Sequence, residues 1–184
     1  MSDTALLLID FQNDYFPGGK WELEACDQAA EKGAELLAAF RAKGLPVVHV
    51  RHEFTTDEAP FFLPGSEGAH IHSSVAAQDN EPVVLKHSAN SFKETNLKEI
   101  LDTLEIKNLI VVGAMSHMCI DAGVRAAADF GYNVTVAQDA CATRDQEFNG
   151  ITVPAKQVHA AYMAALSFAY ARVVDTEMLL AEID

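Results

Sequence analysis

The chain alternates between two kinds of apolar pattern, and this alternation limits its possible folds more than any other feature. One kind is a short, continuous run rich in Val, Leu and Ile, which suits a strand buried on both faces of a parallel sheet. Between several of these runs, apolar residues recur with helical spacing. The runs are Ala5–Ile9, Val47–Val50, Val83–Leu85, Leu109–Val112, Val134–Ala137 and Val173–Val174.

The helical segments fit between the predicted strands. The first ends at Gly44, with Pro46 just beyond, which is typical of a helix C-terminus. Strands and helices in alternation predict an open parallel sheet with helices on both faces. We therefore predict a single domain, residues 1–184, of the α/β class: a three-layer α/β/α sandwich with a mainly parallel, Rossmann-like sheet. The helical stripes are Ala29–Phe40, Leu97–Leu104, Ala122–Phe130 and Val158–Leu166, and residues 54–80 are predicted to form an irregular loop over one end of the sheet.

Composition narrows the possible partners and location. A net charge of −14 argues against nucleic acid or an anionic membrane, because both require a basic face. The first residues, MSDTALLLID, lack the pattern of a signal peptide, and no apolar run is long enough to span a membrane. The sparse, unpatterned cysteines, Cys26, Cys119 and Cys141, indicate reduced thiols rather than a disulfide framework. We therefore expect a cytoplasmic protein.

Three reactive side chains lie just after predicted strands. Asp10 ends ALLLID, Lys86 ends VVLK, and Cys119 follows LIVVG after a short turn and opens the next helix. Ligands of such sheets bind at the carboxyl ends of the strands. A carboxylate, an ammonium and a thiol are therefore expected to meet at one edge.

Each of these residues also has an ordinary structural interpretation. Asp is common in turns, Lys at a strand end usually extends into solvent, and Cys often packs as a small apolar residue. The combination favours chemistry, because a thiol at a helix N-terminus beside a cation is expected to have a lowered pKa. Asp10 then supplies the acid–base partner that acyl transfer needs.

Four segments resemble the signature segments of the isochorismatase-like cysteine hydrolases. They are DFQNDYF at 10–16, VLKHSANSF at 84–92, VVGAMSHMCID at 111–121 and DACATRD at 139–145. The resemblance runs from Leu6 to about Leu180. Any one motif is weak, but the ordered set is specific.

The resemblance implies roles for particular residues. Asp10, Lys86 and Cys119 match the family's catalytic triad. The Ala114–Met115 peptide is implied to be cis, and the backbone N–H groups of Met115 and Cys119 are implied to form the oxyanion hole.

The remaining cysteines and histidines give no clear cofactor site. Cys26 and Cys141 are interpreted as structural. Related nicotinamidases carry an Asp-x-His pair after the second strand, but here that region reads HVRHEF, without the aspartate. His70 and His72 stand two apart in a loop, which is a weak metal pattern. No GxGxxG motif is present, so a dinucleotide site is not expected. We expect neither a metal nor an organic cofactor.

These features together predict a hydrolase that cleaves an amide-type C–N bond of a small molecule through a thioester on Cys119. Hydrolysis of an isochorismate-type vinyl ether needs no covalent nucleophile, so Cys119 favours amide chemistry. A metal-dependent nicotinamidase and a non-catalytic flavin- or nucleotide-binding module remain alternatives. Tyr15, Phe92 and His117 flank the catalytic segments and are predicted to contact the substrate, and a homo-oligomer is expected.

Overall fold

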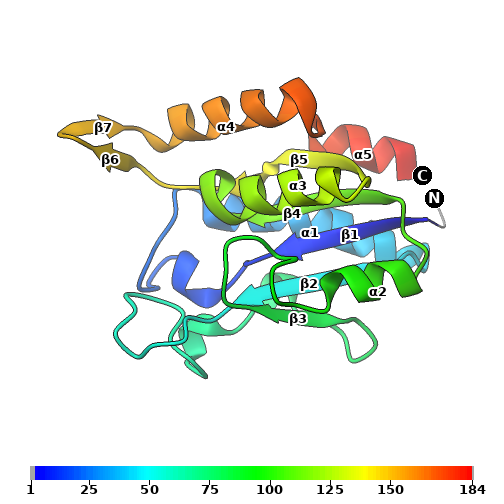
Figure 1. Ribbon diagram of the computed structural model, residues 1–184, viewed down its shortest axis with the longest axis horizontal. Helices are drawn as coiled ribbons and strands as arrows, with labels where there is room; N and C mark the ends of the chain where they lie inside the picture. Colours follow the sequence, from blue (N-terminus) through cyan, green and yellow to red (C-terminus); the bar gives the residue numbers. More distant parts are fainter. Residues whose placement is uncertain (1–2, 184) are drawn as a thin grey trace.

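The central sheet contains six parallel strands in the order β3-β2-β1-β4-β5-β8 (Figure 1). The computed structural model describes residues 3–183. Every apolar run predicted to be a strand lies in this sheet. The strands are β1 (Thr4–Ile9), β2 (Val47–His52), β3 (Val83–Lys86), β4 (Asn108–Ala114), β5 (Asn133–Ala142) and β8 (Arg172–Val174).

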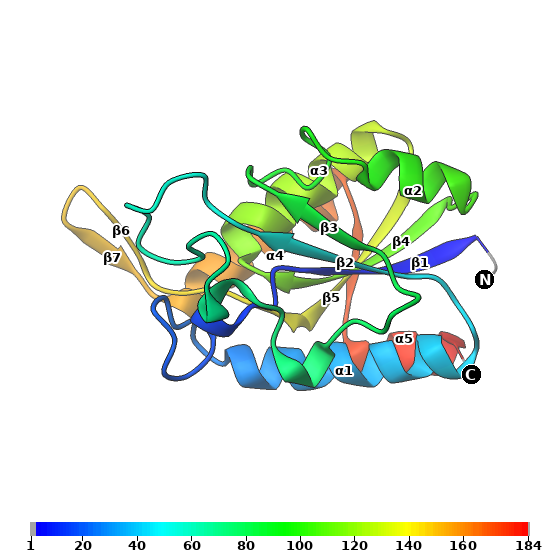
Figure 2. The same ribbon diagram turned by 90° about the horizontal axis from the view of Figure 1, so that it is seen from below.

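Helices cover both faces of the sheet, which confirms the predicted α/β/α sandwich (Figure 2). One face carries α1 (Cys26–Ala42) and α5 (Thr176–Ile183), whose apolar residues pack with Leu6 and Leu8 of β1. The alternate residues of β1 point to the other face and its helices. These are α2 (Leu97–Thr103), α3 (Asp121–Asp129) and α4 (Ala155–Ala169).

Helix α1 shows why the sequence folds in this way. Leu36, Leu37 and Phe40 recur with helical spacing and are almost completely buried against the sheet. Full burial of a side chain of this size stabilises the fold by about 1.5–3 kcal/mol. The helix ends before Gly44, whose φ of 63° lies in the left-handed region that favours glycine.

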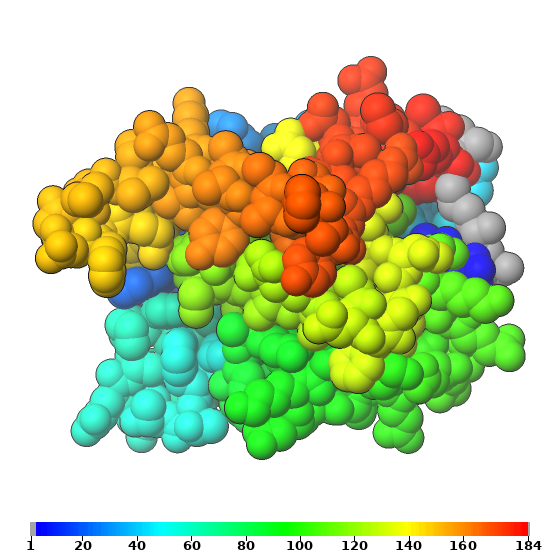
Figure 3. Space-filling model, turned by 45° about the horizontal axis from the view of Figure 1, so that its top comes forward, coloured from blue at the N-terminus to red at the C-terminus, as the bar shows by residue number. Residues whose placement is uncertain are grey.

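Two elements lie outside the sequence prediction. One is α5, and the other is an antiparallel hairpin formed by β6 (Gln146–Phe148) and β7 (Ile151–Val153). The hairpin projects from one end of the molecule (Figures 1 and 3). Residues 54–80 are largely irregular, as predicted, with only two short 3-10 turns at Glu67–Ala69 and Ser73–Val75. A further 3-10 turn, Asn13–Tyr15, follows β1.

None of the helices within residues 3–183 combines the length and apolarity needed to cross a bilayer.

Candidate active site

The ends of β1 and β3 and the turn after β4 bring a carboxylate, an ammonium and a thiol together. The Lys86 Nζ lies 2.7 Å from Asp10 Oδ2 and 3.2 Å from Cys119 Sγ. Asp10 and Lys86 are completely buried, and Cys119 is 7% exposed. The structure therefore places all three predicted residues in one contiguous cluster at the carboxyl edge of the sheet.

The backbone at Asp10 turns sharply as β1 ends. Its φ is 55°, in the left-handed region that Asp tolerates better than most residues. Its N–H donates to the Val50 carbonyl at 2.9 Å, which keeps the turn attached to β2. The Asp10 side chain therefore does not follow the alternation of side chains between the two faces of the sheet, and it reaches the ammonium of Lys86.

Cys119 lies in a π-helical turn, Ser116–Ile120, that connects β4 to α3. The Ala114–Met115 peptide before it is cis, the geometry expected from the resemblance. The Met115 carbonyl accepts hydrogen bonds from the N–H groups of Met118 and Ile120. Gly113 has a φ of 130°, and a Cβ there would meet the Ile9 carbonyl, so only glycine permits β4 to pass so close to β1.

Two side-chain contacts connect the Ser116–Ile120 turn to neighbouring elements. The Ser116 Oγ lies 2.9 Å from His159 Nδ1 on α4. The His117 Nδ1 lies 2.6 Å from the Thr143 Oγ1, just beyond β5. One contact to α4 and one to the residue after β5 therefore both hold the turn that carries the Cys119 thiol.

The electrostatics of the thiol differ from the sequence prediction. Burial and the neighbouring Asp10 carboxylate raise the pKa of Cys119 to about 12, although Lys86 acts in the opposite direction. The expected lowering of this pKa is wrong, because the sequence shows the nearby cation but not the depth of burial. Burial lowers the pKa of Lys86, but Asp10 and Cys119 outweigh it, so that pKa is raised. The resting site holds a protonated thiol beside an ammonium–carboxylate pair.

A cavity of about 500 Å³ lies beside the π-helical turn that carries Cys119. Its lining includes His117 and Met118 of that turn, Met115 just before it, and Trp21 and Phe61 from two loops. The Arg144 guanidinium stacks 4.2 Å from the Trp21 ring on the same wall. The rest of the lining comes from Asp145, Gln146, Glu147 and Thr152.

The sequence analysis missed Arg144 and the hairpin that lines this cavity. One signal was available for the hairpin, because Asn149–Gly150 is a dipeptide typical of a tight two-residue turn. Both residues have the positive φ values, 52° and 74°, that such a turn requires.

The three predicted substrate contacts lie in different surroundings. His117 lines the cavity. Tyr15 is buried in an aromatic cluster with Phe61 and Phe62, and burial raises its pKa well above the usual value. Phe92 packs in the core with its ring centroid 5.2 Å from that of Phe130. Neither Tyr15 nor Phe92 is among the residues that line the cavity.

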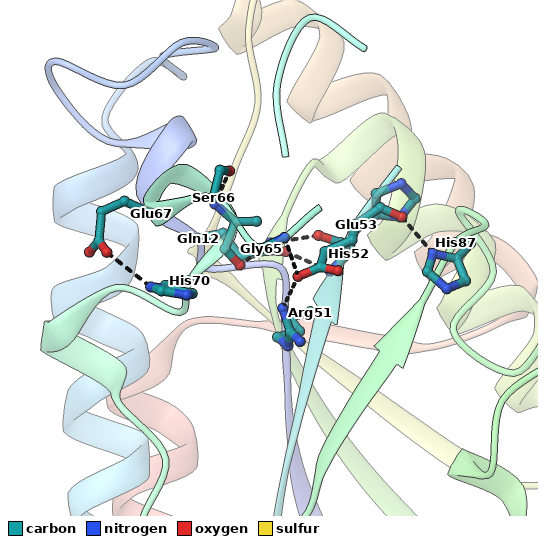
Figure 4. Close-up of polar contacts among 10 residues, drawn as sticks. Gln12, Arg51, His52, Glu53, Gly65, Ser66, Glu67, His70 and His87 are labelled. Carbon is teal, nitrogen blue, oxygen red and sulfur yellow. Dashed lines mark hydrogen bonds and ion pairs between the residues drawn. The ribbon is translucent and has the colours of Figure 1, made fainter. Parts of the chain in front are cut away.

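The histidines considered as metal ligands each have another partner. His49 lies 3.0 Å from a Glu81 carboxylate oxygen, and His70 lies 3.1 Å from Glu67, the contact visible in Figure 4. The His52 Nδ1 faces the Lys86 ammonium at 3.2 Å, which is an environment unsuited to coordinating a second cation. Within residues 3–183, no three His, Cys, Asp or Glu side chains are grouped to hold a metal ion.

Cys26 and Cys141 are buried away from the cluster. Cys26 begins α1 and is 1% exposed. Cys141 lies near the end of β5 and beside a smaller cavity of about 280 Å³, which it shares with His159. Burial raises the pKa of each thiol to about 12.

Comparison with known proteins gives a consistent result. The family model described as the isochorismatase domain matches residues 4–178. The isochorismatase family protein YddQ of Bacillus subtilis, itself uncharacterised, is 49% identical over 96% of this chain and 98% of its own length.

Two further relatives extend the comparison. A solved structure from Oleispira antarctica, described provisionally as an isochorismatase hydrolase, is 67% identical with a TM-score of 0.95, covering 98% of this chain and 97% of that one. Nicotinamidase 3 of Arabidopsis thaliana is 27% identical over 96% of this chain and 86% of its own length.

Proposed function

Because the chain belongs to the isochorismatase family of hydrolases, we propose that it cleaves an amide-type C–N bond of a small molecule with Cys119 as nucleophile. One observation carries the proposal. The Lys86 ammonium lies 2.7 Å from the Asp10 carboxylate and 3.2 Å from the Cys119 sulfur, and Met118, the neighbour of Cys119 in the chain, lines a cavity large enough for a small substrate. This arrangement joins a nucleophile to a proton acceptor.

The first half of the proposed reaction forms a thioester. Since the thiol is protonated at rest, its proton moves to Asp10 as the Cys119 sulfur attacks the carbonyl carbon. The electron pair of the carbonyl shifts to oxygen, where the N–H groups of Met115 and Cys119 stabilise it. The C–N bond then breaks, and the leaving nitrogen takes the proton back from Asp10.

The second half releases the acid. The Asp10 carboxylate removes a proton from water, and the water oxygen attacks the thioester carbonyl. The carbon–sulfur bond breaks, and the Cys119 sulfur recovers a proton from Asp10. Lys86 remains charged throughout and stabilises whichever of its two partners is anionic.

The cavity supports a compact substrate. A volume of about 500 Å³ falls within the range of small-molecule sites, and Trp21 and Phe61 give it a flat apolar wall. The candidate substrates are therefore small aliphatic and aromatic amides, carbamates and lactams with a largely neutral core. Because Arg144 adds a cation to the wall, each neutral compound should be paired with its carboxylate-bearing analogue.

The alternatives are weaker on this site. A metal-dependent nicotinamidase needs a ligand set, but His49 and His52 of β2 already face Glu81 and Lys86. A vinyl-ether hydrolase has no use for a thiol held against a carboxylate. A non-catalytic flavin- or nucleotide-binding module is disfavoured because the chain belongs to a family of hydrolases.

We also propose that the protein is a cytoplasmic homo-oligomer. The hairpin and α4 form a continuous ridge on the surface (Figure 3). Two large apolar side chains of these elements are exposed: Phe148 of β6 by 84% and Phe168 of α4 by 91%. Such residues are typical of protein interfaces. Sedimentation of the wild-type protein and of Phe168→Glu tests this, since a monomeric wild-type protein would contradict it.

The proposed chemistry is tested by a hydrolysis screen that measures release of ammonia or amine. Reactions quenched rapidly should show the acyl mass on the peptide containing Met118 and Cys119. Cys119→Ala should be inactive, whereas Cys26→Ala serves as the matched control and should retain activity. Turnover only of vinyl ethers, with no acyl adduct, would refute the amide proposal.

A further inference from the structure

The Lys86 ammonium has three close partners. Besides Asp10 Oδ2 at 2.7 Å and Cys119 Sγ at 3.2 Å, it lies 3.2 Å from His52 Nδ1. A lysine ammonium has three N–H donors, and this one is completely buried. The contacts to Cys119 Sγ and His52 Nδ1 are hydrogen bonds, whereas the contact to Asp10 is an ion pair whose carboxylate oxygens lie outside hydrogen-bond geometry. His52 Nδ1 is therefore one of two hydrogen-bond acceptors for this buried ammonium, which matters because an unpaired buried donor is costly.

The sheet itself places His52 in this position. Strand β2 lies between β1 and β3, and His52 is directly paired with Lys86 in the parallel register. Residues paired across neighbouring strands project from the same face of a sheet. The imidazole is therefore brought to the ammonium by the register of two regular strands rather than by a loop.

Both the backbone and the ring of His52 are held firmly. The Gln12 side chain donates to the His52 carbonyl and accepts from its N–H, each at 2.7 Å (Figure 4). The imidazole packs edge-to-face with the Phe54 ring, with the two ring centroids 4.7 Å apart. His52 is only 7% exposed and is not among the residues that line the cavity.

The protonation state of the ring follows from these neighbours. Burial and the adjacent Lys86 ammonium lower the pKa of His52 to about 4. The ring is therefore neutral near neutral pH. Since Nδ1 faces a donor, Nδ1 is the acceptor and Nε2 carries the hydrogen, although Nε2 is buried and has no hydrogen-bond partner among the described residues.

We propose that His52 is a positioning residue for Lys86: its Nδ1 accepts one N–H of the ammonium and so holds the other two towards Asp10 and Cys119. This inference rests on the proposed function of the Asp10–Lys86–Cys119 cluster. Without an acceptor at this point, the ammonium can satisfy this donor only by rotating away from its partners. Loss of this acceptor should weaken the Lys86–Cys119 contact most, because that contact, at 3.2 Å, is longer than the 2.7 Å ion pair between Lys86 and Asp10.

The test compares variants with and without the acceptor. His52→Leu removes it with little change in volume, whereas His52→Asn places an amide oxygen near the position of Nδ1. The readout is the rate of alkylation of Cys119 by iodoacetamide at mildly alkaline pH, resolved by peptide mapping. We expect Leu to slow alkylation about tenfold, the effect of one pKa unit on the thiolate fraction, and Asn to restore it to within about threefold.

The same His52 substitution made in a Lys86→Met variant separates an effect that acts through Lys86 from a general structural effect. In Lys86→Met, exchanging His52 for Leu should change the alkylation rate by less than about twofold, because the residue acts through the ammonium. His70→Leu, at an exposed position, is the control and should match wild type. Equal effects of Leu and Asn, or the same loss with and without Lys86, would overturn the proposal.

Nitrogen NMR of the wild-type protein provides a measurement that needs no variant to fold. Long-range proton–nitrogen spectra should show His52 as the neutral tautomer with the hydrogen on Nε2. A hydrogen on Nδ1 would overturn the proposal directly. Neither the alkylation nor the NMR experiment depends on turnover. A failed hydrolysis screen would therefore refute the proposed amide hydrolysis, while these two experiments would still test the His52–Lys86 contact.

Discussion

Lys86 and Asp10 form an ion pair of 2.7 Å in which neither side chain is exposed to solvent. Such a pair is expensive to desolvate, and its net contribution to stability is small. Removing one partner is costly, however, because the other charge is left buried alone. The two residues are therefore coupled in stability as well as in chemistry.

Lys86→Met should lower the free energy of unfolding by about 3–5 kcal/mol, the usual cost of an uncompensated buried charge. Adding Asp10→Asn should recover part of this loss, because no charge then remains unpaired. Urea denaturation of the two single variants and the double variant measures the coupling. Additive losses would show that the ion pair does not behave as a unit.

Asp10→Asn should reduce turnover of any substrate found by about 10²–10⁴-fold, since an amide cannot accept and return the proton. Asn retains the size and the tolerance of a left-handed backbone at this position, but it leaves the Lys86 ammonium buried without its partner, so urea denaturation should first establish that the variant is folded under the assay conditions. Asp57→Asn, at an exposed loop position, is the matched control and should leave turnover unchanged. A fully active Asp10→Asn enzyme would remove Asp10 from the mechanism.

Cys119 should be alkylated before Cys26 and Cys141. Burial raises the pKa of all three thiols to about 12, and a neighbouring aspartate adds to the shift at each of them. The expected order therefore rests on the Lys86 ammonium, which lies 3.2 Å from the Cys119 sulfur and stabilises the thiolate there, whereas neither of the other two thiols has a lysine among the causes of its shift. Limiting iodoacetamide followed by peptide mapping gives the order. The rate at Cys119 should rise with pH, because the thiol is protonated at rest. Labelling of Cys26 first would count against the site.

Prolonged treatment with a chelator should leave activity unchanged. The expectation rests on the histidines of β2, where His52 faces an ammonium and His49 is paired with Glu81. Elemental analysis of the purified protein should find well below one metal per chain. Loss of activity that returns with added zinc or iron would instead favour the nicotinamidase alternative.

Glu81 should stabilise the fold in a pH-dependent way. Burial acts against its charged form, but Arg41, the Gln78 backbone and His49 outweigh it and lower its pKa from 4.5 to about 2. A lowered carboxyl pKa contributes stability that is present above about pH 4.5 and lost as the pH falls towards 2.

Glu81→Gln should therefore cost about 1–3 kcal/mol of unfolding free energy at neutral pH, and the difference should shrink below pH 4.5. Urea denaturation across this range measures it, with the exposed Glu58→Gln as control. A difference that does not depend on pH would show that Glu81 acts through packing and not through its charge.

The sheet could be predicted because its inner strands β1, β2 and β4 are buried on both faces and therefore appear as continuous apolar runs. The edge strands β3 and β8 are partly exposed but consist largely of apolar, β-branched residues. The carboxyl ends of the strands then indicated which reactive residues should meet. Helix α5 was missed because Thr176–Ile183 is too short for its periodicity to separate it from a strand or loop. The hairpin was missed because its strands are exposed, as at Phe148, and show no buried pattern.

The electrostatic state of the site could not be predicted in the same way. The sequence shows that a cation and a thiol converge, but the pKa of Cys119 depends on how completely water is excluded from it. The role of His52 depends on register, since only the pairing of β2 with β3 brings it to Lys86. Both properties arise from tertiary structure.

The hairpin β6–β7 pairs with itself and lies outside the six-stranded sheet, yet Gln146, Glu147 and Thr152 line the cavity. Its sequence and length can therefore vary without disturbing the strands that carry Asp10 and Lys86. A change in this one projection would alter the cavity wall and leave the Asp10–Lys86–Cys119 cluster unchanged. For protein engineering, the hairpin is accordingly the segment to randomise when the shape of the cavity is to be changed.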